Sequence, residues 1–149
     1  MATVERNSFD EFVKVNAPKH DTGIDYIRSI YKALDVPADF VLWFARLFWP
    51  RTLVVDGKAF VVDLFDKERY ESFRQSGHSL SSAQFWTNLL EVTGLFDDLP
   101  ESKALEVAES LAASWNSKIE SECPEAAGRA RVIHDGTTGE VFVAIGNPD

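Results

Sequence analysis

The chain has 149 residues, a single cysteine and a net charge of −9, with 24 acidic and 15 basic side chains. This length fits one domain, which buries enough surface to fold without disulfides or a structural metal. The charge becomes more negative along the chain, from −1 over residues 1–50 to −5 over residues 101–149. A negative surface repels phosphate backbones, so we expect no nucleic-acid binding.

The beginning of the chain predicts two helices. Ser8 and Glu11 have the spacing of a capping box, which favours a short first helix. Thr22 and Asp25 favour the start of a second helix, because both side chains can bind free backbone N–H groups there. The predicted helices cover residues 9–14 and 23–35. The second helix has one apolar face, formed by Ile24, Ile27, Tyr31 and Leu34.

A third predicted helix, residues 38–49, carries apolar side chains on nearly every side and is too short to span a membrane. Helices of this kind usually lie at the centre of a core, which is the first interpretation. A small domain has little room to cover every side of a helix, so the alternative is an exposed patch for dimerisation or partner binding. The candidate patch residues are Trp43, Phe44, Phe48 and Trp49.

The middle of the chain changes to the alternating pattern of strands. Asp56 and Gly57 are typical of a two-residue hairpin turn, because both tolerate a positive φ angle. Asp66 then favours the start of a short helix, and Ser81 with Gln84 favours the start of another. The predicted elements are strands over 52–55 and 58–65 and helices over 67–75 and 82–93.

The last third of the chain predicts the longest helix and a second hairpin. The helix covers residues 100–121, between Pro100 and Pro124, and the hairpin strands cover residues 129–134 and 140–145. The inner face of the helix is formed by Leu105, Ala108, Leu111, Ala112, Trp115 and Ile119.

Paired strands with short turns favour antiparallel pairing and the α+β class. An isolated hairpin is only marginally stable, so we predict that the two hairpins form one small, mainly antiparallel four-stranded sheet packed against about five helices. Residues 1–149 then form a single α+β domain. An alternative interpretation makes residues 1–20 a loosely packed N-terminal arm.

The sequence contains no recognisable spacing for catalysis or for a cofactor. The histidines and the cysteine lack the spacing of common zinc sites, and no glycine-rich phosphate loop is present, so we predict no metal and no cofactor. An enzyme or small-ligand binder remains an alternative, with a pocket between the sheet and the helices where polar groups converge. The candidates for such a pocket are Asp63, Tyr70, Arg131 and His134.

Acidic side chains cluster around the longest predicted helix. Three of them, Asp97, Asp98 and Glu101, lie near its start, where the helix dipole favours acids. Three more, Glu106, Glu109 and Glu120, lie opposite its apolar face. One interpretation is an ordinary solvated helix face. The other is a docking face for a basic protein.

These patterns favour a non-enzymatic protein-binding domain. A specific form of this hypothesis is an immunity-type inhibitor of a basic toxin, because acidic charge accelerates the capture of a basic partner. A related alternative is an acidic secretion chaperone that forms a homodimer through the aromatic helix. The absence of a signal-like start predicts a cytoplasmic protein.

Overall fold

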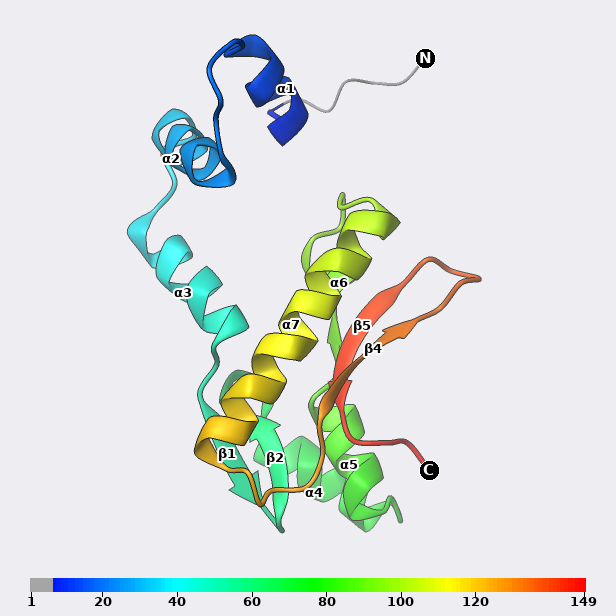
Figure 1. Ribbon diagram of the computed structural model, residues 1–149. Coiled ribbons are helices and arrows are strands. Elements are labelled where there is room, and N and C mark those ends of the chain that lie inside the picture. Colours follow the sequence, from blue (N-terminus) through cyan, green and yellow to red (C-terminus); the bar gives the residue numbers. More distant parts are fainter. Residues whose placement is uncertain (1–6) are drawn as a thin grey trace. The chain divides into compact units, whose positions relative to one another are not determined.

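The computed structural model describes residues 7–149 and divides the chain into two compact units, Met1–Trp43 and Phe44–Asp149. Helices combine with small antiparallel sheets, so the predicted α+β class is confirmed (Figure 1). The elements of the described residues are α1 (Phe9–Val15), α2 (Gly23–Ala33), α3 (Ala38–Phe48), β1 (Thr52–Val55), β2 (Lys58–Val61), the 3₁₀ helix η1 (Val62–Leu64), α4 (Lys67–Gln75), α5 (Leu80–Thr87), β3 (Leu90–Glu91), α6 (Val92–Leu95), α7 (Glu101–Glu122), β4 (Ala130–His134) and β5 (Val141–Ile145).

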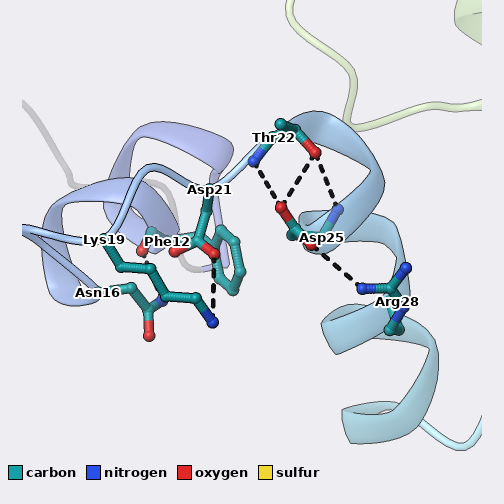
Figure 2. Close-up of polar contacts among 7 residues, drawn as sticks. All are labelled: Phe12, Asn16, Lys19, Asp21, Thr22, Asp25 and Arg28. Atoms are coloured by element: carbon teal, nitrogen blue, oxygen red, sulfur yellow. Dashed lines mark hydrogen bonds and ion pairs between the residues drawn. The ribbon is translucent and has the colours of Figure 1, made fainter.

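The N-terminal unit contains α1, α2 and the first part of α3, and local caps position its first two helices. The Ser8 hydroxyl accepts a hydrogen bond from the backbone N–H of Glu11 at 3.1 Å. At the start of α2, the Asp25 carboxylate accepts from the Thr22 N–H at 2.8 Å, and the Thr22 hydroxyl accepts from the Asp25 N–H (Figure 2). Both predicted helix starts are therefore confirmed, and each cap satisfies N–H groups that have no partner inside the helix.

This unit has little interior. The rings of Phe9 and Phe12 pack edge-on against Tyr26, with centroid separations of 5.6 Å in both pairs, and so hold α1 to one side of α2. None of the described residues from 7 to 43 is buried. The structure of this part of the chain therefore depends on helix caps and a few ring contacts rather than on a core.

The C-terminal unit has a true hydrophobic core, which forms where α7 packs on the sheet that contains β4 and β5. Trp115 is its largest buried side chain, and its indole N–H donates to the Leu47 carbonyl at 2.8 Å. The structure buries Ala108, Leu111, Ala112, Trp115 and Ile119 as the sequence predicts, together with Ala104, and it leaves Leu105 partly exposed.

The prediction of one four-stranded sheet is wrong. Strands β1 and β2 form a two-stranded sheet, and a separate three-stranded sheet has the order β3-β5-β4. The Asp56-Gly57 turn is confirmed, with φ angles of 51° and 75°, and Val55 pairs with Lys58 directly beside it. Both hairpins form, but the strand predicted over residues 58–65 ends at Val61, where the 3₁₀ helix η1 begins. The two hairpins do not join.

Side-chain amides explain why no further described strand pairs with β2. The Asn88 carbonyl accepts from the Val61 N–H at 3.0 Å, and its amide donates to the Ala59 carbonyl at 3.1 Å. Gln84 also donates to the Ala59 carbonyl, at 2.9 Å. The side-chain amides thus bind backbone groups that a further strand would need. They also satisfy these buried groups, which would be costly to leave unpaired.

Both amides come from the region where the sequence predicts a helix over residues 82–93, and that prediction is also wrong. Helix α5 begins earlier, after its N-cap Ser79, and ends at Thr87. The chain then enters the short strand β3, where Leu90 pairs with Val143 of β5. Hydrogen bonds between β3 and β5 therefore form where the sequence predicts the last turns of the helix.

Candidate functional site

The apolar stripe of α2 is the most exposed set of large apolar side chains in the N-terminal unit. Ile24, Ile27, Tyr31 and Leu34 follow one another at the spacing of a single helix face. Their exposed fractions are 69%, 68%, 46% and 55%. The contacts with α1 come from a different side of α2, through Tyr26, so α1 does not cover this stripe.

A groove of about 440 Å³ runs along this stripe and is bounded on its other side by the start of α3. Its surface is almost entirely apolar. The groove is lined by Ile24, Ile27, Arg28 and Tyr31 of α2 and by Ala38 and Val41 of α3. We call the six residues Ile24, Ile27, Tyr31, Leu34, Ala38 and Val41 the N-terminal apolar face.

Local sequence signals fix the two walls of the groove. Asp35, with a φ angle of 50°, and Pro37 separate α2 from α3. At the other end of α2, hydrogen bonds from the backbone and side chain of Thr22 lower the pKa of Asp25 (Figure 2). The Arg28 guanidinium lies 3.1 Å from the Asp25 carboxylate, which places an ion pair beside the apolar stripe.

The four aromatic residues proposed as a patch differ in their contacts and exposure. Phe44 and Phe48 pack against each other with ring centroids 5.5 Å apart, and Phe44 also contacts Phe96 at 6.2 Å. Phe48 is half-buried against the core of the C-terminal unit. Trp49 is 48% exposed and lies under the Lys118 ammonium group, 5.1 Å from the ring centroid. Of the four, Trp43, also 48% exposed, belongs to the N-terminal unit.

No residue of α3 is buried. The interpretation that places this helix at the centre of a core is therefore wrong, and the alternative of an exposed apolar helix fits the structure.

The six acidic candidates are all exposed on or beside α7. Glu101 forms a hydrogen-bonded ion pair with His134, and Glu120 accepts from the Arg129 guanidinium at 2.9 Å. Glu106 and Glu109 are exposed on the middle of the helix. Asp97 and Asp98 are exposed in the turn before it. All six acids are therefore exposed, and two of them also bind neighbouring basic side chains.

The polar residues proposed for an enzyme-like pocket are not brought together. Arg131 lines a polar pocket of about 300 Å³, whose lining does not include Asp63, Tyr70 or His134. Tyr70 is buried and donates a hydrogen bond to Asp56 at 2.7 Å. Burial, together with this hydrogen bond, raises the pKa of Tyr70 to about 12, which fits a structural tyrosine that stays protonated.

The polar pocket itself is lined by Lys58, Ser81, Gln84, Gly128, Arg129, Arg131, Gly146 and Asn147. Several of these groups have structural roles. The Arg129 guanidinium donates to the carbonyls of Ala126 and Gly128 at 2.9 and 2.8 Å, and the Arg131 guanidinium donates to the Gly146 carbonyl at 3.2 Å.

Within residues 7–149, no group of three or more His, Cys, Asp or Glu side chains is placed to hold a metal ion. No helix in the same part of the chain has the length and apolar character needed to cross a membrane.

The sequence identifies the stripe of α2 but assigns it no binding role. An apolar face at helical spacing is the ordinary signal of a core-facing helix, so the residues alone predict burial. The one available signal is the neighbouring helix α3, whose nearly continuous apolar sequence exceeds what a small unit can bury. Comparison of the chain with protein-family models, with curated proteins and with solved structures found no match.

Proposed function

We propose that this chain is a non-enzymatic protein-binding domain and that the N-terminal apolar face is its binding surface. The observation that carries the proposal is the exposure of the α2 stripe in a unit where no described residue is buried. Units of about 40 residues rarely fold without a disulfide, a metal or a partner. The cysteine, Cys123, lies outside this unit, and a bound partner would cover the exposed stripe.

The size of the surface supports the same proposal. Large apolar side chains carry roughly 150–250 Å² each, so the exposed parts of the N-terminal apolar face add up to on the order of 600 Å². This value is at the upper end of the largest apolar patch on a typical monomer, and such patches are often functional. The groove between α2 and α3 also fits the way in which apolar grooves accept amphipathic helices.

Site-specific photocrosslinking in the source cell tests this proposal. A photoreactive amino acid replaces Ile27 in the N-terminal apolar face or, as a control, Gln75 on the exposed side of α4. We expect covalent protein adducts from position 27 and few or none from position 75. Equal adducts at both positions, or none at position 27, would contradict the proposal.

A second proposal concerns the acidic surface. We propose that the exposed acids of α7 accelerate the capture of a basic partner, as an immunity-type inhibitor of a basic toxin would require. Its support is the charge of residues 44–149, which carry 17 acids and 10 bases and therefore a net charge of −7.

Association kinetics with a basic protein that binds the chain test this second proposal. Replacing Glu106 and Glu109 by Gln, and raising the salt concentration, should each slow association several-fold. An association rate that does not change with salt would remove the proposal while leaving the apolar binding face in place.

A further inference from the structure

We infer that the occupant of the N-terminal apolar face is a second copy of this chain, in a two-fold symmetric dimer. This inference rests on the proposed function and names its partner. In a two-fold dimer the same surface patch serves both copies, so the patch must be complementary to itself. Three properties of the face meet this condition: its area, its charge and its pattern along α2.

The area fits a weak but specific dimer. Two copies of a surface of about 600 Å² bury roughly 1,200 Å² in total, which is the lower limit of stable protein interfaces. The exposed fraction of Ile24 and Ile27, near 70% for each, shows that most of this surface is available for burial. We therefore expect a dissociation constant in the micromolar range rather than an obligate dimer.

The charge distribution favours self-association here and opposes it elsewhere. Residues 22–43 contain three acids and two bases, with a net charge of −1. The α7 surface displays Glu106 and Glu109 inside a unit of net charge −7, so two copies of that surface repel each other. A second copy can therefore approach the N-terminal apolar face with the least electrostatic cost.

The pattern along α2 sets the direction of pairing. Its four stripe residues alternate at spacings of three and four, which is the spacing that packs two helices along a seam. In an antiparallel pair centred near Ser29, Ile24 faces Leu34 of the second copy, and Ile27 faces Tyr31. The opposed helix dipoles of the two copies favour the antiparallel pair.

Molar mass as a function of concentration tests the inference on the full chain. Light scattering after size exclusion, from about 1 to 500 µM, should show a reversible change from a mass of 16.7 kDa to twice that value. Ile27→Asp should weaken dimerisation at least 100-fold, because it buries a charge at the centre of the seam. Leu95→Asp is the matched control, since Leu95 is 49% exposed outside the face, and it should leave the mass curve unchanged.

A charge-pair rescue tests the antiparallel direction and does not depend on any single variant. Tyr31→Lys alone should also be monomeric, whereas an equimolar mixture with Ile27→Asp should form a dimer, because position 27 of one chain faces position 31 of the other. Far-UV circular dichroism establishes that each variant keeps its helices. A mixture that stays monomeric would overturn the antiparallel pairing.

The wild-type chain decides between the remaining outcomes. A wild-type mass that stays at one chain up to 500 µM would overturn the dimer, as would an equal effect of Leu95→Asp and Ile27→Asp. If the crosslink from position 27 then leads to a different protein, the dimer fails and the proposed function stands. If position 27 gives no protein adduct either, both fail.

Discussion

Helices α2 and α7 carry the same kind of apolar stripe, but only the stripe of α7 is buried. Leu111, Trp115 and Ile119 of α7 are almost fully buried against β5, whereas Ile24 and Ile27 of α2 are more than two-thirds exposed. Helical spacing therefore shows which side chains share a face, but not what covers that face. In the C-terminal unit the cover is a sheet of the same chain, and for the N-terminal unit we propose a second chain.

The two units also differ in how they form helices. In the N-terminal unit the caps at Ser8 and Thr22 are clear, while no described residue of this unit is buried. In the C-terminal unit α7 begins at Pro100 without a side-chain cap and has six buried residues. Local hydrogen bonds thus start α1 and α2, whereas tertiary packing holds α7, since packing supplies most of the stability of protein helices.

The largest expected effect comes from removing one apolar side chain from each unit. Leu111→Ala should lower the free energy of unfolding by about 2–5 kcal/mol, because the site is fully buried and a cavity remains. Ile27→Ala should change it by less than about 0.5 kcal/mol at a concentration where the chain is monomeric. Urea denaturation followed by circular dichroism measures both. Equal effects would contradict the difference between the two units.

A buried and an exposed amide give the next largest difference. Asn88→Ala should cost about 2–3 kcal/mol, because the Val61 N–H and the Ala59 carbonyl each lose a hydrogen bond inside the protein. Asn16→Ala is the control: its amide donates to the Phe12 carbonyl at 2.7 Å on the surface, where water replaces the bond. The same denaturation experiment applies. A cost below about 0.5 kcal/mol for Asn88→Ala would show that its bonds do not hold the end of the sheet.

The elements that the sequence predicts well are those defined by neighbouring residues. The Asp56-Gly57 turn and the Thr22-Asp25 cap depend on a few adjacent side chains, and both form as predicted. The long helix α7 is predicted because its apolar stripe continues over many turns and is buried nearly as expected. Local chemistry and sustained periodicity were sufficient in these cases.

The errors arise where distant residues decide the outcome. The sequence assigns Gln84 to a helix cap and gives Asn88 no role, yet both are fully buried and bind the backbone of β2, about 25 residues earlier in the chain. These hydrogen bonds occupy the edge of β2 that another strand would need, and no pattern of neighbouring residues in the sequence predicts them. The candidate site was missed for the same reason, because the exposure of Ile27 depends on what packs against α2 and not on its neighbours in sequence.

The smallest expected effect compares the tyrosines of the two units as the pH rises. Burial and the hydrogen bond to Asp56 raise the pKa of Tyr70 from its ordinary value near 10 to about 12. Between these two values the folded chain keeps the phenol proton and the unfolded chain loses it. The unfolded state then binds fewer protons, so the free energy of unfolding falls as the pH rises through this window.

Within that window the free energy of unfolding falls by about 1.4 kcal/mol for each unit of pH. Tyr70 should therefore lower the free energy of unfolding by about 1 kcal/mol between pH 9 and pH 11. Tyr70→Phe should remove this part of the alkaline loss, although it costs about 1 kcal/mol at pH 9 through the lost hydrogen bond. Tyr31→Phe, at a residue that is 46% exposed, should change the free energy of unfolding by less than about 0.5 kcal/mol at pH 9. Urea denaturation of the three chains at both pH values measures the difference. If Tyr70→Phe and the wild type lose stability equally, the Tyr70 phenol is not protected in the folded state, and the contrast between a packed C-terminal unit and an open N-terminal unit is weaker than the structure indicates.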